Sequence, residues 1–215
     1  MQDSNDVKKF KGTTTVGLVC SDGVVVAADK RATMGYFIAN RDVQKVFPID
    51  EHLALTVAGG VGDAQALVRV MQAQVKLYKL ENNKKMSVGA AATLLANILH
   101  QYKFFPFYVQ MLVAGIDGEP RIFNLDPLGG TTEEKFVSTG SGSLTAYGYL
   151  ENAYEDGMNV KDGLKVAARA VATAMKRDCA SGDGIDLVSI TKSGVKTLGK
   201  SEVKKLLESQ APKKK

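Results

Sequence analysis

Three consecutive threonines, Thr13, Thr14 and Thr15, follow Gly12 at the start of an apolar segment. A threonine hydroxyl keeps its proton at neutral pH and attacks a carbonyl only when a base lies nearby. If the bond between Gly12 and Thr13 is cut, Thr13 acquires its own base, because a free α-amine titrates at about 7.7–8.0. The alternative is structural, since β-branched residues are common in strands. The segment is therefore either a self-contained nucleophile at Thr13 or a plain strand start, and Thr14 and Thr15 fit a strand in both cases.

A second group of candidate residues carries charge. Asp29 ends a continuously apolar run, so its carboxylate should be paired, and Lys30, Arg31 and Lys45 are the available cations. A structural ion pair is one interpretation. The other brings the Lys45 ammonium close to Thr13, where it would favour the alkoxide and keep the terminal amine neutral while Asp29 orients it.

Two glycines, Gly59 and Gly60, follow another apolar run and precede a helical pattern. Backbone N–H groups at such a turn can bind a developing oxyanion, and the helix dipole favours negative charge there. An ordinary turn between a strand and a helix explains the same two glycines. The sequence alone leaves both interpretations open.

Other catalytic chemistries have little support. The chain has only two histidines, His52 and His100, and it contains no HExxH motif, no CxxC pair and no phosphate-binding GxxxxGK[ST] loop. Asp178, Asp183 and Asp186 are spaced as in a loop and give only a weak cation signal. We therefore expect neither a metal nor a cofactor. An N-terminal threonine is a nucleophile that needs no histidine.

Composition excludes several classes of protein. The net charge of +5 lies at the ends of the chain, because residues 1–12 carry +1 and residues 200–215 carry +4, while residues 13–199 are neutral. A neutral body disfavours a nucleic-acid-binding module. No apolar run approaches the roughly 18 residues that span a bilayer. A single disulfide between Cys20 and Cys179 is unsupported, and two such cysteines fit a reducing, cytoplasmic location.

Hydrophobic periodicity predicts that strands connected by hairpins alternate with pairs of helices. Strands are expected over residues 13–20, 24–28, 34–39, 44–47, 53–58, 109–116, 121–125, 135–139, 185–191 and 195–198. Helices are expected from about residue 63, from a Ser87 cap to residue 102, and over residues 144–154, 160–176 and 202–208. This order predicts an α+β fold in which helix pairs cover two packed antiparallel sheets. Residues 13–199 should form one domain, followed by a basic helix and solvated tail at 200–215.

Six short motifs occur in a fixed order along the chain. They are Thr13-Thr14-Thr15-Val16-Gly17, Ala27-Ala28-Asp29-Lys30-Arg31-Ala32-Thr33, Lys45-Val46-Phe47, Ala58-Gly59-Gly60, Gly140-Ser141-Gly142-Ser143 and Asp178-Cys179-Ala180-Ser181-Gly182-Asp183. Each motif alone is weak, but the ordered set extends from Thr13 to about Leu198. The set resembles the catalytic β subunits of 20S proteasomes, most of all those of archaea.

This resemblance implies the four-layer αββα fold of the N-terminal nucleophile hydrolases and the activity of a threonine endopeptidase. It implies a leader, residues 1–12, that is removed by autocatalytic cleavage between Gly12 and Thr13. A chain that keeps this leader should be an inactive precursor, because the Thr13 nitrogen is then an amide. The implied catalytic residues are the nucleophile Thr13, the charged partners Asp29 and Lys45, the residues that support the terminal amine, Ser141, Asp178 and Ser181, and the oxyanion donor Gly59.

The resemblance also implies how substrates and partners are bound. Thr33 should hydrogen-bond the substrate backbone, and Arg31 should line the site. The implied specificity pocket is apolar, which predicts cleavage after large hydrophobic residues; it consists of Ala32, Val43, Phe47, Val57 and Val61. The implied partners are other β subunits in heptameric rings, proteasome α subunits and a regulatory ATPase.

Two other identities remain open beside this one. A bacterial threonine protease of the HslV type shares the paired threonines and the Gly-Gly, although the Asp29-Lys30-Arg31 stretch and the C-terminal hairpin favour the proteasome. A non-catalytic ring subunit that serves only assembly is the alternative from another class. The intact Thr13, Asp29 and Lys45 disfavour it.

Overall fold

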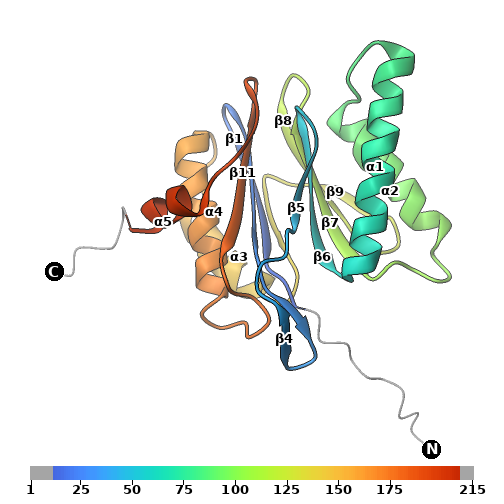
Figure 1. Ribbon diagram of the computed structural model, residues 1–215. Coiled ribbons are helices and arrows are strands. Elements are labelled where there is room, and N and C mark those ends of the chain that lie inside the picture. Colours follow the sequence, from blue (N-terminus) through green and yellow to red (C-terminus); the bar gives the residue numbers. More distant parts are fainter. Residues whose placement is uncertain (1–11, 209–215) are drawn as a thin grey trace, which may run out of the picture.

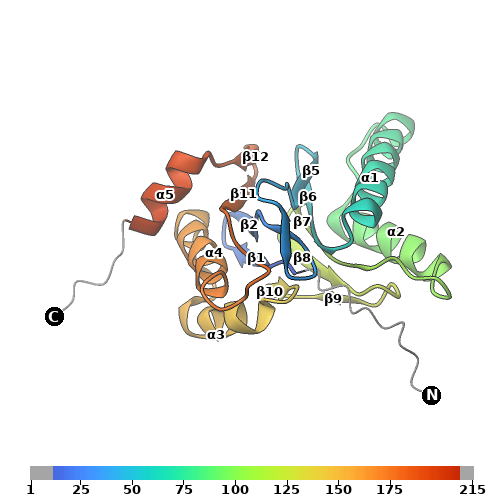
Figure 2. The same ribbon diagram turned by 60° about the horizontal axis from the view of Figure 1, so that its bottom comes forward.

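Two antiparallel β-sheets packed face to face form the centre of the molecule, and helices cover the outer face of each sheet (Figure 1, Figure 2). The computed structural model describes residues 12–208, and these residues form twelve strands and five helices. The α+β fold with a four-layer αββα arrangement is confirmed. Residues 1–11 of the predicted leader and residues 209–215 of the predicted tail lie outside the described residues.

The first sheet brings Thr14 beside Asp29. Its order is β10-β1-β2-β11-β12, with β1 (Thr15–Cys20), β2 (Gly23–Asp29), β10 (Phe136–Thr139), β11 (Ile185–Thr191) and β12 (Gly194–Thr197). Thr15 pairs with Ala28 on β2 and with Thr139 on β10. Because β1 and β2 are antiparallel, Thr13 and Asp29 lie at the same end of this sheet.

The second sheet supplies the opposite wall of the site. Its order is β5-β6-β7-β8-β9, with β5 (Val46–Asp50), β6 (Leu53–Gly59), β7 (Val109–Ile116), β8 (Pro120–Leu125) and β9 (Thr131–Glu133). Lys45 directly precedes β5, and its carbonyl accepts a hydrogen bond of 3.0 Å from the Val57 N–H on β6. The end of β6 at Gly59 therefore lies near the start of β5.

Each sheet has its own helices. The second sheet packs on α1 (Val61–Asn82) and α2 (Val88–Gln101), whereas the first packs on α3 (Ser143–Ala153) and α4 (Val160–Ala174). The short α5 (Lys200–Glu208) packs against α4. The predicted cap of α2 is confirmed, because the Ser87 hydroxyl accepts a hydrogen bond of 3.1 Å from Ala90 N–H.

Strand β2 is buried on both faces, which explains its continuously apolar sequence. Side chains alternate between the faces of a strand. Val24, Val26 and Ala28 accordingly pack between the two sheets, while Val25 and Ala27 pack under the helices of the first sheet. The expectation of a strand covered on both sides is confirmed.

The structure differs from the predicted elements in several places, and the predicted strand over residues 44–47 is β5 at Val46–Asp50. Residues 34–39 are not one extended segment but a separate hairpin, in which β3 (Ala32–Met34) pairs with β4 (Phe37–Asn40). The chain turns at Gly35, whose φ of 61° is a conformation that glycine adopts without strain. The structure also adds the short β9 and starts α1 at Val61, ahead of the predicted Asp63.

None of the helices within residues 12–208 combines the length and hydrophobicity that a crossing of the bilayer requires.

Candidate active site

Thr13 lies just ahead of β1, with a side chain that is almost fully buried. Its hydroxyl donates a hydrogen bond of 2.7 Å to the Gly12 carbonyl, and its N–H donates one of 3.2 Å to Ser141 Oγ. Gly140 approaches the segment from another side, so closely that a Cβ at that position would lie 2.0 Å from the Thr13 carbonyl oxygen. The nucleophile candidate is therefore fixed against the peptide bond that precedes it.

The Asp29 carboxylate is fully buried and satisfied on both oxygens. Oδ1 accepts hydrogen bonds from Lys45 Nζ at 2.8 Å and from Thr14 N–H at 2.9 Å. Oδ2 accepts from Arg31 N–H at 2.9 Å and from Gly182 N–H at 3.0 Å. Four donors on one carboxylate connect the start of β1, the residue before β5 and two loops.

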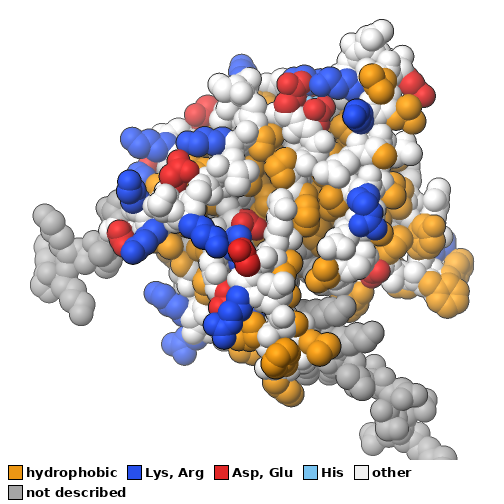
Figure 3. Space-filling view, in the orientation of Figure 1, with side chains coloured by type: hydrophobic (Ala, Val, Ile, Leu, Met, Phe, Trp, Pro, Cys, Tyr) orange, Lys and Arg blue, Asp and Glu red, His pale blue; other side chains and the backbone are white. Residues whose placement is uncertain are grey.

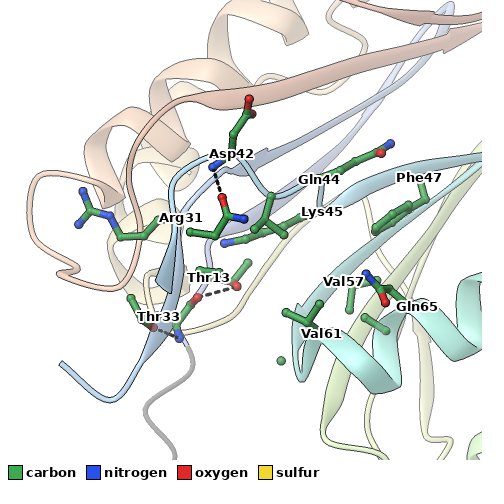
Figure 4. Close-up of a pocket in the computed structure, with 16 residues that line it drawn as sticks. Thr13, Arg31, Thr33, Asp42, Gln44, Lys45, Phe47, Val57, Val61 and Gln65 are labelled. Carbon is green, nitrogen blue, oxygen red and sulfur yellow. Dashed lines mark hydrogen bonds between the residues drawn. The ribbon is translucent and has the colours of Figure 1, made fainter. Parts of the chain in front are cut away.

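Lys45 is buried beside Asp29, and burial lowers the pKa of its ammonium while the Asp29 carboxylate partly offsets that effect. Its side chain runs along the cavity toward Thr13 (Figure 4). A lysine that gives up its proton more easily than usual, in a cavity that Thr13 also lines, suits proton transfer.

A second network runs on the other side of Thr13. Ser141 Oγ and Ser181 Oγ both donate hydrogen bonds of 2.6 Å to Asp178 Oδ2. Ser181 Oγ also lies 2.7 Å from Thr14 Oγ1. Because the Ser181 proton is already donated to Asp178, the Thr14 hydroxyl is the donor in that contact. The hydrogen bonds that run from Thr13 N–H through Ser141 end on the Asp178 carboxylate. This carboxylate can stabilise the positive charge of a protonated amine at Thr13.

Arg31 connects the end of β2 to the loop that carries Asp178 and Ser181. Its Nε donates a hydrogen bond of 2.6 Å to Asp183 Oδ2, and its Nη1 donates one of 2.8 Å to the Cys179 carbonyl. The Arg31 guanidinium lowers the pKa of Asp183. This contact holds the loop in place.

Two cavities meet at Thr13. The first, of about 400 Å³, is lined by the predicted pocket and site residues Arg31, Ala32, Thr33, Val43, Lys45, Phe47, Val57, Gly59 and Val61, together with Gly12 and Thr13 (Figure 4). The second, of about 350 Å³, is lined by Thr13, Gly59 and Ser141 and by Ala58, Tyr108, Val109, Gln110, Pro127 and Gly140. The two cavities share only Thr13 and Gly59 among their lining residues, so a bound chain would pass these two residues.

Gly59 has a φ of 130°, and a Cβ there would lie 2.1 Å from the Tyr108 carbonyl oxygen. Both facts require glycine. The residue ends β6 directly before Gly60, the N-cap of α1, and this N-cap makes no side-chain capping bond. This position fits the predicted oxyanion role, which stays a prediction.

The proteasome subunit family matches residues 9–190 of the chain. The proteasome subunit beta of Archaeoglobus profundus is 54% identical over 204 residues, which cover 94% of this chain and 95% of that protein. That of Methanocaldococcus vulcanius is 52% identical over 201 residues, covering 92% and 90%. The proteasome subunit beta 1 of Thermococcus onnurineus is 48% identical over 201 residues, covering 94% and 99%. The chain belongs to the proteasome family as a β subunit of the archaeal type.

Several residues of this β subunit's site have no counterpart in the sequence-based predictions. Thr14 was expected only to begin a strand, yet its hydroxyl joins the Ser181 contact. The first cavity is also lined by four polar residues, Asn40, Asp42, Gln44 and Gln65. Asp42 and Gln44 flank Val43, a predicted pocket residue. Their position beside Val43 in the sequence was the signal that could have identified them as lining residues. Gln65 lies one helical turn after Val61 and could have been found from that spacing.

The three aspartates with a weak cation signal serve different partners. Asp178 accepts hydrogen bonds from the two serines, Asp183 pairs with Arg31, and Asp186 pairs with Lys30. Within the described part of the β subunit, no group of three or more potential ligands could hold a metal ion. Cys20 and Cys179 are both free, and burial raises the pKa of the Cys20 thiol to about 12.

Proposed function

We propose that the β subunit is a threonine endopeptidase with the Thr13 hydroxyl as its nucleophile. The supporting observation is the position of this hydroxyl. It is hydrogen-bonded to the carbonyl of the preceding peptide bond at 2.7 Å, at the junction of two cavities. The Asp29–Lys45 pair and the Ser141–Asp178–Ser181 network flank it and supply groups that can move protons.

The first reaction is cleavage of the chain's own Gly12–Thr13 bond. Thr13 Oγ attacks the Gly12 carbonyl carbon, the C–N bond breaks, and the proton lost by the hydroxyl passes to the leaving nitrogen. This yields an ester between the Gly12 acyl group and Thr13 Oγ, and water hydrolyses the ester to a Gly12 carboxylate. Thr13 then carries a free α-amine, which can act as a base at neutral pH.

The mass of the assembled subunit tests this first reaction. We expect a chain that begins at Thr13 and lacks residues 1–12, measured by intact mass spectrometry after co-expression with the α-subunit partner. Full peptidase activity in subunits that all retain residues 1–12 would contradict the proposal, because the Thr13 nitrogen would still be an amide.

Hydrolysis of other polypeptides repeats the same chemistry with the free amine as base. The Thr13 amine accepts the hydroxyl proton, the alkoxide attacks the scissile carbonyl, and the Gly59 N–H stabilises the oxyanion. Donors of this kind are worth about 3 kcal/mol. The amine then protonates the leaving nitrogen, and water releases the acyl group. Ser141 and Asp178 orient the amine, whereas Lys45 lowers the free energy of the alkoxide.

The first cavity is the proposed site for the residue before the scissile bond, because Gly12 lines it and does not line the second cavity. Its hydrophobic lining predicts preference for large apolar side chains; it consists of Ala32, Val43, Phe47, Val57, Val61 and Ala64. Thr33 Oγ1 accepts a hydrogen bond of 3.4 Å from Gly12 N–H, which supports a role in aligning the backbone.

A charge placed in this cavity should change the preference. In Val61→Glu, we expect the ratio of kcat/KM for fluorogenic peptides with Lys to those with Leu before the scissile bond to rise about tenfold. Attraction between charges about 4 Å apart near a protein surface reaches that size. Val70→Glu is the matched control, since Val61 is 43% exposed and Val70 is 42% exposed on the same helix, but only Val61 lines the cavity. An equal change in both variants, or a wild type that prefers acidic or basic residues, would contradict the assignment.

We further propose assembly into heptameric β rings enclosed by α-subunit rings and served by a regulatory ATPase, in the cytoplasm. Exposed apolar side chains support burial in an assembly: Tyr36 is 94% exposed and Phe37 is 66% exposed at the β3–β4 hairpin, which forms a hydrophobic tip (Figure 3). Relatives named as proteasome β subunits favour this assembly over the HslV type.

A further inference from the structure

The residue before the cleavage site has no room for a side chain. A Cβ built on Gly12 would lie 1.8 Å from Ala180 Cβ, 3.1 Å from Ala180 Cα and 2.7 Å from Ser141 Oγ. Non-bonded carbon atoms prefer separations of about 3.5–4.0 Å. An alanine at position 12 therefore collides with the Ala180 methyl group first and with the Ser141 hydroxyl second.

Hydrogen bonds fix the segment around Ala180, so moving this segment to make room for a side chain at position 12 would cost free energy. The Ala180 N–H donates a hydrogen bond of 3.2 Å to Asp178 Oδ1. The preceding carbonyl, of Cys179, accepts one of 2.8 Å from Arg31, and the N–H of Gly182 donates one of 3.0 Å to buried Asp29. Because these bonds hold the loop on both sides of Ala180, a side chain at position 12 would displace the scissile peptide instead.

We propose that Ala180 is a specificity-determining residue for self-cleavage, whose methyl group restricts the residue before Thr13 to glycine. This inference rests on the proposed cleavage between Gly12 and Thr13. A displaced peptide would lose the 2.7 Å contact between the Thr13 hydroxyl and the Gly12 carbonyl, and attack would slow.

The restriction applies to the leader and not to other substrates. A Cβ at Gly12 would meet Ala180 and Ser141, and neither of these residues lines the first cavity. A substrate residue with a large side chain in the first cavity must therefore present its backbone in another orientation. Ala180 thus makes leader removal require glycine before Thr13, whereas peptide hydrolysis keeps its preference for large apolar residues.

A double-mutant cycle tests this separation. Wild type, Gly12→Ala, Ala180→Gly and the double variant are co-expressed with the α-subunit partner, and the rate of leader removal is followed by intact mass. Gly12→Ala is expected to slow removal about tenfold or more in the wild-type background. In the Ala180→Gly background, the factor by which the same substitution slows leader removal should be at least three times smaller. Relief should be partial, because the Ser141 contact remains.

A larger residue at position 180 gives an independent measurement. Ala180→Val should slow removal of the unchanged Gly12 leader about fivefold or more. Its peptidase activity is measured in a chain produced as a ubiquitin fusion that is released directly at Thr13, which reports folding and assembly without leader removal. A slower leader removal with a smaller change in the activity of the released chain supports the proposal.

Three outcomes would overturn the inference: a Gly12→Ala rate equal to wild type, the same slowing in both backgrounds of the cycle, or normal leader removal in Ala180→Val. Failure of the proposed function looks different, because the wild type would then keep its leader, or Thr13→Ala would lose it.

Discussion

Replacing Thr13 with alanine is expected to abolish both removal of residues 1–12 and hydrolysis of peptides. The substitution deletes the hydroxyl that contacts the Gly12 carbonyl and leaves the backbone, the Asp29–Lys45 pair and the serine network in place. Loss of a catalytic nucleophile typically lowers kcat on the order of 10⁴-fold or more. Intact mass and a fluorogenic peptide assay of the assembled particle measure the two losses separately.

Two variants make this result specific. Thr132→Ala makes the same change on the exposed strand β9 and should leave both reactions unchanged. Thr13→Ser keeps a hydroxyl and should retain leader removal and part of the peptidase activity. Unchanged peptidase activity in Thr13→Ala would instead identify a non-catalytic ring subunit.

Replacing Asp29 with asparagine should destabilise the subunit by about 3–5 kcal/mol, the usual cost of removing one partner from a buried ion pair. Asp29 is fully buried, and each of its oxygens accepts two hydrogen bonds. An asparagine has only one oxygen, so its NH₂ group must face two donors in either orientation. Lys45 is left without its counter-charge. The free energy of unfolding of the isolated subunit, from urea titration, measures the effect.

The control breaks a lysine–aspartate pair at the surface. Asp156 pairs with Lys135, and their side chains are 69% and 68% exposed, so Asp156→Asn should cost at most about 1 kcal/mol. Similar losses in the two variants would contradict the importance of the buried site.

The pH dependence of this variant has a definite sign. Burial lowers the pKa of Lys45 from its usual 10.5, and Asp29 opposes that shift, so Asp29→Asn lowers the pKa further. The penalty for a buried ammonium is complete below the folded pKa and disappears as Lys45 loses its proton. The destabilisation should therefore shrink as the pH rises toward 10.5, the usual pKa of a lysine, and a loss that grows with pH over that range would contradict it.

Much of the fold follows from local patterns. The apolar run of β2 identifies a strand buried on both faces, and the turn residues Lys192, Ser193 and Gly194 locate the hairpin of β11 and β12. The turn at Gly35 was missed because Met34 and Phe37 on either side are apolar, as in a continuous strand. They are 70% and 66% exposed, and hydrophobicity alone does not distinguish such residues from core residues.

Local sequence patterns indicate less of the site than of the fold. Thr13 and Asp29 could be selected by residue type and by their places at strand ends. The Ser141 contact spans 128 positions and the Thr14–Ser181 contact spans 167, so no local pattern indicates them. The resemblance to a known family supplied Ser141, Asp178 and Ser181, whereas the role of the Thr14 hydroxyl needed the three-dimensional arrangement.

The glycines around Thr13 imply an unusual profile of mutational tolerance. At each of four of them an added Cβ would lie less than 3.0 Å from a backbone atom or a short side chain, and these four are Gly12, Gly59, Gly140 and Gly142. In a deep mutational scan, alanine at these positions should therefore reduce function about as much as the loss of a functional group such as Asp29 does. Gly62 and Gly148 have open space and should accept alanine. Function at this site should therefore depend on empty volume as strongly as on reactive atoms.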